Sequence, residues 1–103
     1  MQIQPIKRGH GKNLEGDGLR RILVDVFGEE HVGESSGKYE VFYGALNPLR
    51  TWLEGKGLAV ETIMKKDVDE EVARDTIKKY NQFLDRATGY TAKERIKRAR
   101  KGG

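Results

Sequence analysis

Apolar and polar residues alternate most regularly between Lys38 and Met64. A period of two places successive side chains on opposite faces of a β-strand, each strand being half-buried. Three runs follow this period, and they cover residues 39–43, 49–54 and 58–63. Turn-forming segments separate them at Gly44–Pro48 and at Gly55–Gly57. The pattern therefore predicts an antiparallel meander of three strands.

Two other stretches have the period of an amphipathic helix. In the first, the apolar stripe consists of Leu19, Ile22, Leu23, Val26 and Phe27. Asp17 is a candidate N-cap for this helix and Gly28 a candidate C-terminal stop. The second begins near Asp67 or Asp69 and ends at Gly89. Its stripe consists of Ala73, Ile77, Tyr80, Leu84 and Ala87, and it is widened by Val72, Thr76 and Phe83. The chain is thus expected to contain two main helices, one before the meander in the sequence and one after it.

Weaker signals complete the element order. Gln2–Lys7 is predicted to be an edge strand because Pro5 cannot donate to a ladder, and Glu29–Glu34 gives a faint strand signal. The order β-α-β-β-β-β-α predicts a two-layer α+β sandwich, an antiparallel sheet of four to five strands with two helices on one face. Residues 1–90 are expected to form a single domain. Residues 91–103 are expected to form a basic C-terminal helix or tail that a capping box at Thr91–Glu94 begins.

This element order matches one half of the TATA-box-binding protein fold, and we adopt that architecture by analogy. A ferredoxin-like fold is the alternative. It requires a further strand after the second helix, and the sequence offers no candidate for one.

Three segments carry a resemblance to a known family. They are RGHGKNLEGDGL (Arg8–Leu19), YEVFYGAL (Tyr39–Leu46) and ATGYTAKERIKRA (Ala87–Ala99). The chain resembles, along nearly its whole length, a family of small uncharacterised conserved proteins of archaea. The resemblance implies a two-layer sandwich and no established activity, so no functional residue is carried over from it.

The charge is concentrated at one end of the chain. The 103 residues carry a formal net charge of +4, and 36% of them are apolar, enough for one modest core. Residues 91–103 hold six cations against Glu94, so this tail is strongly basic and residues 1–90 are close to neutral. Electrostatic arguments about partners therefore concern the tail first.

A two-layer fold leaves one face of its sheet uncovered. If Val41 and Leu49 face the helices, then Phe42, Trp52 and Ile63 point the other way, together with Arg50. An apolar cluster on an uncovered face calls for a partner, so we expect a non-enzymatic module that meets another protein or a second copy of itself. Simple exposure, or cover by the tail, is the plainer interpretation. Aromatic rings could also stack on bases, but three glutamates on this face would repel phosphates: Glu40, Glu54 and Glu61.

Nucleic acid is the alternative partner, and it would use the basic segments. The loop Lys7–Lys12 (KRGHGK) combines cations with glycines, although it contains neither a Walker A nor a dinucleotide-binding spacing. The candidate contacts are Arg8, Lys12, Lys93, Arg95, Lys97, Arg98, Arg100 and Lys101. Such contacts neutralise phosphates without reading sequence. The plainer interpretations are a tight connection for the loop and a solvated terminus for the tail.

Catalysis has little support in the sequence, and no cofactor or metal site is predicted. An enzyme that uses the glycine-rich loop region is the third and weakest hypothesis. His10 and His31 are the only histidines, and neither stands in a recognised spacing with a nucleophile. There is no cysteine, which excludes disulfides and thiolate metal sites. The acidic residues near Asp67 are interpreted as partners of the helix dipole. No apolar run approaches the roughly 20 residues of a membrane span, so a cytoplasmic protein without membrane contact is expected.

Overall fold

The computed structural model describes residues 2–55, 57–91, 93–95 and 97. Its strands and α-helices are β1 (Gln2–Pro5), α1 (Gly18–Phe27), β2 (Val32–Ser35), β3 (Lys38–Tyr43), β4 (Leu46–Glu54), β5 (Gly57–Met64) and α2 (Glu70–Thr88). Two short 3-10 helices precede β2, namely η1 (His10–Leu14) and η2 (Glu29–His31). The predicted order β-α-β-β-β-β-α is confirmed.

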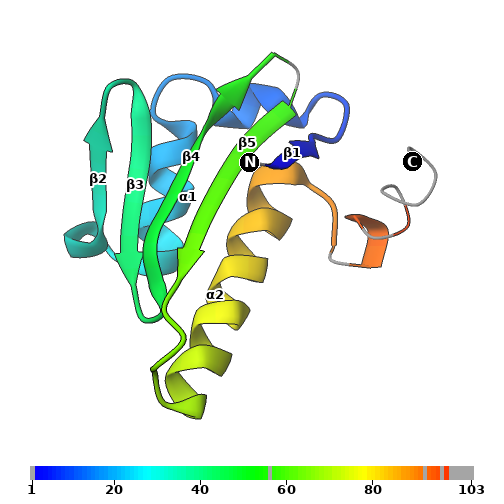
Figure 1. Cartoon of the computed structure of the whole chain (residues 1–103). Coiled ribbons are helices and arrows are strands. Elements are labelled where there is room, and N and C mark those ends of the chain that lie inside the picture. The colour runs from blue at the N-terminus through cyan, green and yellow to red at the C-terminus, as the bar shows by residue number, and fades with distance from the viewer. Residues whose placement is uncertain (1, 56, 92, 96, 98–103) are drawn as a thin grey trace.

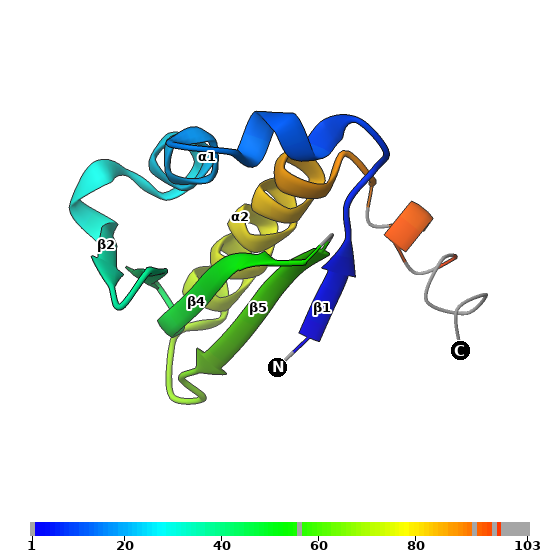
Figure 2. The same ribbon diagram turned by 90° about the horizontal axis from the view of Figure 1, so that it is seen from above.

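The five strands form one antiparallel sheet in the order β1-β5-β4-β3-β2. Figure 1 shows the sheet toward the viewer with α1 behind it, and the view from above shows both helices on the same side of the sheet (Figure 2). The predicted two-layer sandwich is therefore confirmed. Among the described residues no strand follows α2, so the strand that a ferredoxin-like fold needs is not found there. No helix in the described ranges has the length and apolar character to cross a bilayer.

Alternation along the strands separates the two faces of the sheet as predicted. Val41, Leu49 and Leu58 face the helices and are fully buried. Phe42 and Ile63 point to the uncovered face, and 51% and 60% of their surface is exposed. The orientation inferred from the period of two is thus confirmed.

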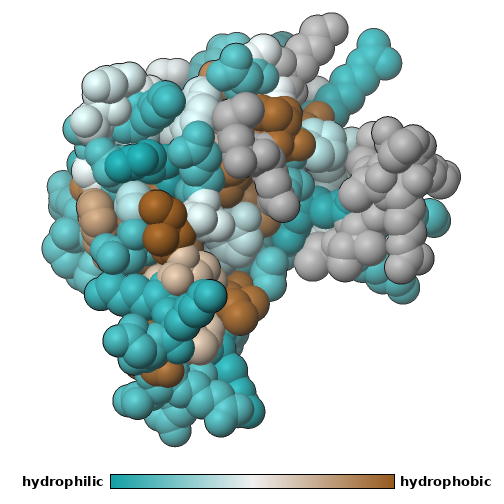
Figure 3. Space-filling view, in the orientation of Figure 1, coloured by the Kyte–Doolittle hydropathy of each residue, from teal (hydrophilic) through white to brown (hydrophobic). Residues whose placement is uncertain are grey.

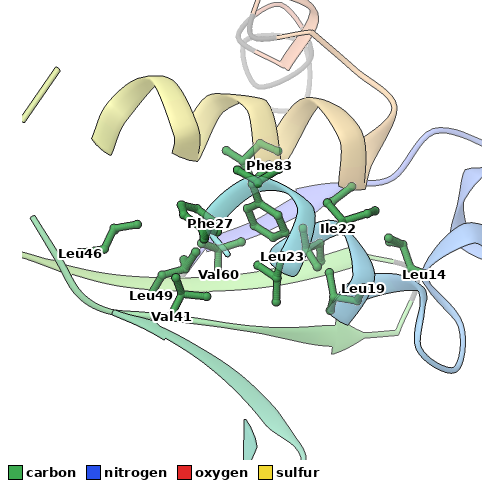
Figure 4. Packing of buried hydrophobic residues seen from close by; sticks show 14 residues of the cluster. Leu14, Leu19, Ile22, Leu23, Phe27, Val41, Leu46, Leu49, Val60 and Phe83 are labelled. Carbon is green, nitrogen blue, oxygen red and sulfur yellow. The ribbon is translucent and has the colours of Figure 1, made fainter. Parts of the chain in front are cut away.

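The core lies between the helices and the sheet. Phe83 of α2 is fully buried and belongs to the same core cluster as Val60 of β5 and Leu23 of α1, and its ring points from α2 toward the sheet (Figure 4). The ring of Phe27 stands at 6.2 Å from that of Phe83 and 5.4 Å from that of Tyr43, measured between centroids. Tilted pairs at such distances add to the hydrophobic stabilisation of a core. One shared cluster therefore joins both helices to the sheet.

The connection after β1 is more ordered than a glycine-rich loop was expected to be. Its centre forms η1, and the buried Leu14 at the end of η1 belongs to the core cluster. The strand predicted over Gln2–Lys7 ends at Pro5, and the Lys7 N–H instead donates to the Thr88 carbonyl at 2.8 Å. The segment is thereby attached to the end of α2.

The turn predicted at Gly44–Pro48 is shorter in the structure. β4 begins at Leu46, so Pro48 lies inside a strand. Pairing shifts register between Leu46 and Leu49 on both sides of β4. Because a bulge interrupts the ladder locally, a residue without an N–H is tolerated there.

The buried face of α2 coincides with one side of the predicted stripe. Thr76, Phe83 and Leu84 are buried, whereas Ile77 is 50% exposed. The spacing of apolar residues alone could not decide how far the buried face of α2 extends, because it also fits a stripe that includes Ile77. The exposed isoleucine leaves one apolar side of α2 without a covering element in the described chain.

The two halves of β5 have different surroundings. Gly57–Val60 is buried and pairs with β1 on one side and β4 on the other. Glu61–Met64 runs past the end of β1, and its exposure rises accordingly. The sheet therefore has a free edge along the second half of β5, within the described residues.

Candidate functional site

Trp52 lies in a row of neighbours that crosses the uncovered face. It pairs with Ala59 of β5, which in turn pairs with Ile3 of β1. The Lys38 ammonium lies 4.1 Å from the centroid of the Trp52 ring, and the indole Nε1–H donates to Glu54 at 2.8 Å. Such a cation–π contact is worth about 0.5–1 kcal/mol at an exposed site. The indole is therefore half-buried and already partnered within the chain.

A row of charges lies next to this aromatic row. Arg50 of β4 stands between Glu61 of β5 and Glu40 of β3, and its Nε donates to Glu40 at 3.3 Å. With Lys38, these side chains line a shallow depression of about 210 Å³. Two acids balance two bases here, so the net charge of this surface is close to zero and it attracts a phosphate only weakly. This surface is suited to a mixed-charge protein partner rather than to a polyanion.

Phe42 and Ile63 are the most exposed predicted members of the face. Figure 3 shows this side of the molecule, where brown apolar patches are separated by teal hydrophilic residues. Fully burying a Phe or Ile side chain stabilises by about 1.5–3 kcal/mol, so each half-exposed residue can add roughly 1 kcal/mol on contact. All four predicted interaction residues, which are Phe42, Arg50, Trp52 and Ile63, lie on this face.

The loop and the end of α2 form a second, basic end of the molecule. The His10 Nε2 lies 2.7 Å from the Arg86 carbonyl oxygen, to which it donates, and Gly89 follows α2 in the left-handed conformation. Arg8 and Lys12, which flank His10, are exposed. The structure therefore brings the predicted loop next to the start of the tail.

Arg95 has a different environment from the other predicted basic contacts. Only 8% of it is exposed, and its Nη1 donates to Asp85 at 2.6 Å and to the Tyr90 carbonyl at 2.7 Å. The capping box is present as well, because the Thr91 N–H donates to Glu94 and the Glu94 N–H donates to the Thr91 hydroxyl. Arg95 thus fixes the beginning of the tail to α2 and is not free for phosphate.

The remaining tail cations divide into two groups. Lys93 and Lys97 are exposed beside the docked Arg95. The other three predicted contacts lie outside the described residues: Arg98, Arg100 and Lys101. The basic surface that the structure describes therefore consists of the loop cations and two lysines of the tail.

A cavity of about 490 Å³ opens between η1, α1 and α2. Its polar lining includes Arg21, which has no ion pair among the described residues, and Arg86, which pairs with Asp25 at 3.1 Å. His10 and Asn13 line it from η1, with the Asn13 amide 3.4 Å from the His10 Nδ1. Because the other ring nitrogen donates to a carbonyl, Nδ1 is placed to accept from the Asn13 amide N–H.

Both histidines have structural contacts. The His31 Nδ1 donates to the Phe42 carbonyl at 2.8 Å, and its ring meets Tyr43 edge-on at a centroid distance of 5.2 Å. Across the described residues, no group of three or more His, Asp or Glu side chains has the geometry to hold a metal ion.

Tyr43 links the sheet to α2 through a hydrogen bond. Its hydroxyl donates to Asp75 at 2.5 Å, and this bond, with a smaller effect of burial, raises the pKa of Tyr43 above its ordinary value of 10.0. Burial, and then the nearby Glu34 carboxylate, raises the pKa of Tyr39 in the same direction. Neither tyrosine lies on the uncovered face, so both act in the contact between the layers.

Sequence reasoning identified the uncovered face but missed two features. It placed Arg95 with the binding cations, because no local pattern links that residue to Asp85 across the break at Gly89. It also gave no sign that Arg21 and Asp25, two exposed residues of α1, line a cavity. The α1 period shows that they leave the core, but not that η1 and Arg86 approach them.

Comparison with known proteins gives one family and one similar structure. Residues 1–101 match a family described as a domain of unknown function, DUF5611. No relative among the curated proteins matches the sequence. The NMR solution structure of hypothetical protein TA0095 from the archaeon Thermoplasma acidophilum is similar, with a TM-score of 0.62 and 22% identity over 96% of this chain and 97% of that one. At that identity the likeness shows the fold alone. The chain belongs to the DUF5611 family, and the expected resemblance to uncharacterised archaeal proteins is confirmed at that level.

Proposed function

We propose that this chain is a small, non-enzymatic module that binds another protein through the uncovered face of its sheet. The observation that carries the proposal is the exposure of Phe42 and Ile63, 51% and 60%, on a face that the described chain leaves open. Around them, the charges of Arg50, Glu40 and Glu61 alternate in sign across three strands. Alternating charges give register and selectivity to a protein contact, whereas apolar side chains supply most of its affinity.

Trp52 would offer the partner a ring that is already held in one position within the chain. Its indole is held by Lys38 above and Glu54 beside it. A preorganised ring loses little conformational freedom on binding, which favours affinity. Substitution of Trp52 by Glu would remove both the flat support and the cation–π contact.

A photoreactive amino acid at a single position tests the proposal. We would place it at position 42 on the face and, as a matched control, at the exposed position 78 on α2, and irradiate the host cells. Discrete protein adducts from position 42, lost on Trp52→Glu, support the proposal. Equal adduct patterns from both positions, or none from position 42, would refute it.

A second candidate function, nucleic-acid binding, is favoured by a separate observation. The exposed Arg8 and Lys12 stand at the same end of the molecule as Lys93 and Lys97, because the Lys7 N–H holds the loop to the end of α2. Cations from two distant segments are thereby gathered near one another. This end could follow a phosphate backbone without sequence preference.

Salt dependence of binding tests this second candidate. Each phosphate contact gives a slope of about −0.9 in log affinity against log salt on duplex DNA. The double variant Lys93→Gln/Lys97→Gln should therefore reduce the slope by roughly 2, whereas Arg74→Gln at the other end of α2 should leave it unchanged. An unchanged slope in the double variant removes the described tail residues from the contact.

We also propose that the architecture corresponds to one half of the TATA-box-binding protein fold. The observed order β-α-β-β-β-β-α and the five-stranded antiparallel sheet support this analogy. A structural superposition that fails to align both helices and the meander together would overturn it. The analogy concerns architecture and carries no function.

A further inference from the structure

The cavity between η1, α1 and α2 gathers polar side chains from three elements that are well separated in the sequence. Its volume of about 490 Å³ falls within the range of small-molecule sites, roughly 300–1,000 Å³. The buried Ile22 gives it one apolar wall. Its polar and charged lining consists of His10, Asn13, Arg21, Asp25 and Arg86. A cavity of this size and composition suits an organic molecule rather than a lone ion.

Close contacts fix the shape of this cavity. A Cβ on Gly18, at the start of α1, would collide with the Asn13 carbonyl, so η1 can approach α1 only because this residue is glycine. At the end of α2 the His10 ring lies against Gly89, where a Cβ would stand 3.1 Å from two atoms of the ring. The His10 Nε2 also donates to the Arg86 carbonyl at 2.7 Å. The cavity is therefore preformed, which lowers the entropic cost of binding a ligand.

The charges that line the cavity do not balance. Arg21 and Asp25 are four residues apart on α1, the spacing at which opposite charges pair along a helix. The Asp25 carboxylate instead lies 3.1 Å from the Nη2 of Arg86 on α2. Arg21 has no ion pair among the described residues, and no second carboxylate of the described chain lines the cavity. Within this part of the chain, one positive charge of the cavity lacks a counter-charge.

The hydrogen-bond donors of the cavity suit an oxyanion. The Arg21 guanidinium offers five N–H donors, and that of Arg86 donates to Asp25 through Nη2 alone. The Asn13 amide adds two N–H groups, one of which is directed to His10. Arginine suits phosphate because its planar fork matches two phosphate oxygens at once. A carboxylate has only two oxygens, whereas donors from three elements can serve the three of a phosphate monoester.

We propose that this cavity binds a small molecule that carries a phosphate monoester, with Arg21 as the principal contact. Arg86 and Asn13 donate to the remaining phosphate oxygens, and the organic part of the molecule lies against Ile22. The Asp25 carboxylate accepts from a hydroxyl of the ligand and repels a second phosphate group. The cavity therefore selects a small, singly phosphorylated molecule over a polyanion such as nucleic acid.

This inference goes beyond the proposed function. Both helices lie on one side of the sheet (Figure 2), so a ligand between them would touch no residue of the uncovered face. The cavity also uses none of the cations assigned to the nucleic-acid candidate, which are Arg8, Lys12, Lys93 and Lys97. The inference and the proposed function can therefore fail separately.

Titration of the full chain, followed by NMR, tests the inference. The probes are inorganic phosphate and glycerol 3-phosphate, and a single-stranded oligonucleotide serves for comparison. Glycerol 3-phosphate should shift the side-chain resonances of Arg21 and Asn13 and the amide of Gly18 along one saturating curve. It should bind more tightly than inorganic phosphate, because only the ester has an organic part for the apolar wall. Phe42 and Ile63, on the uncovered face, should not respond.

Two substitutions should change the affinity in opposite directions. Arg21→Gln should raise the Kd for glycerol 3-phosphate about tenfold, because it removes a charge-assisted hydrogen bond. Asp25→Asn should lower the Kd about threefold, because it removes the opposing carboxylate. Arg20→Gln is the matched control: it removes the same charge one residue away, where Arg20 pairs with Glu29 outside the cavity, and the Kd should not change. Circular dichroism of each variant checks that the fold is intact.

The inference is overturned by any of three results: no saturable shift at the cavity with either probe at tens of millimolar, equal weakening by Arg21→Gln and Arg20→Gln, or weaker binding by Asp25→Asn. It is overturned as well if the oligonucleotide binds more tightly than the ester and is released by Arg21→Gln. The cavity would then belong to the nucleic-acid candidate.

Discussion

Replacing Arg95 by Met should detach the beginning of the tail from α2. The substitution removes the guanidinium that donates to Asp85 at 2.6 Å and to the Tyr90 carbonyl at 2.7 Å. Met has a similar length and retains apolar contacts, so the change isolates the polar interactions. The tail should then become accessible to proteases while the sandwich remains folded.

The magnitude follows from the exposure of the two partners. Exposed ion pairs contribute about 0–1 kcal/mol, whereas breaking a fully buried pair costs about 3–5 kcal/mol. The Arg95 side chain is 8% exposed and that of Asp85 is 44% exposed, so the pair lies between these limits. We expect a coupling of about 1–2 kcal/mol, with roughly another 1 kcal/mol from the bond to the carbonyl.

A double-mutant cycle measures this coupling. Urea unfolding would be followed by circular dichroism for wild type, Arg95→Met, Asp85→Asn and the double variant. With a slope of about 1–3 kcal/mol per molar urea, the single Arg95 change should lower the midpoint by roughly 1 M. A coupling below about 0.3 kcal/mol, within the usual error of additivity, would refute the assignment of Arg95 as the anchor of the tail.

Three other changes test the contacts between the layers. Phe83→Ala, at a fully buried position, should destabilise by about 3–5 kcal/mol in the same urea assay. Gly44→Ala should lower the melting temperature, because a Cβ there would collide with the Thr76 hydroxyl and the backbone has φ 53°; Gly37→Ala, which meets no neighbouring atom, is the control with φ strain alone. Because the Tyr43 pKa is raised in the folded state, the unfolded chain loses that proton first and stability falls as pH rises above about 10. Tyr43→Phe should make this fall shallower, and an unchanged pH profile would contradict the role of its bond to Asp75.

The sequence predicted the fold because its local patterns agree with one another. The period of two placed Val41 and Phe42 on opposite faces, and burial confirms both assignments. The capping box at Thr91–Glu94 likewise needs only neighbouring residues. Where the phase of a stripe was ambiguous, as at Ile77, only the position of the sheet could decide it.

The candidate sites were harder to predict because they join distant segments. The partner of Arg95 lies beyond a glycine break, and the support of Trp52 by Lys38 depends on the register between β3 and β4. Burial of an arginine cannot be inferred from a basic tail, whose composition is typical of a solvated terminus.

The position of β1 also bears on how the chain folds. Strands β2 to β5 each pair with the strand that follows or precedes them in the sequence. In contrast, β1 pairs with β5, and nearly the whole sheet-forming sequence lies between these two strands. Closing such a long loop costs entropy before any contact is gained, so we expect the meander to form in the transition state and β1 to be added late. Ile6→Ala, beside β1 and against the core, should then speed unfolding and leave the refolding rate almost unchanged in stopped-flow measurements.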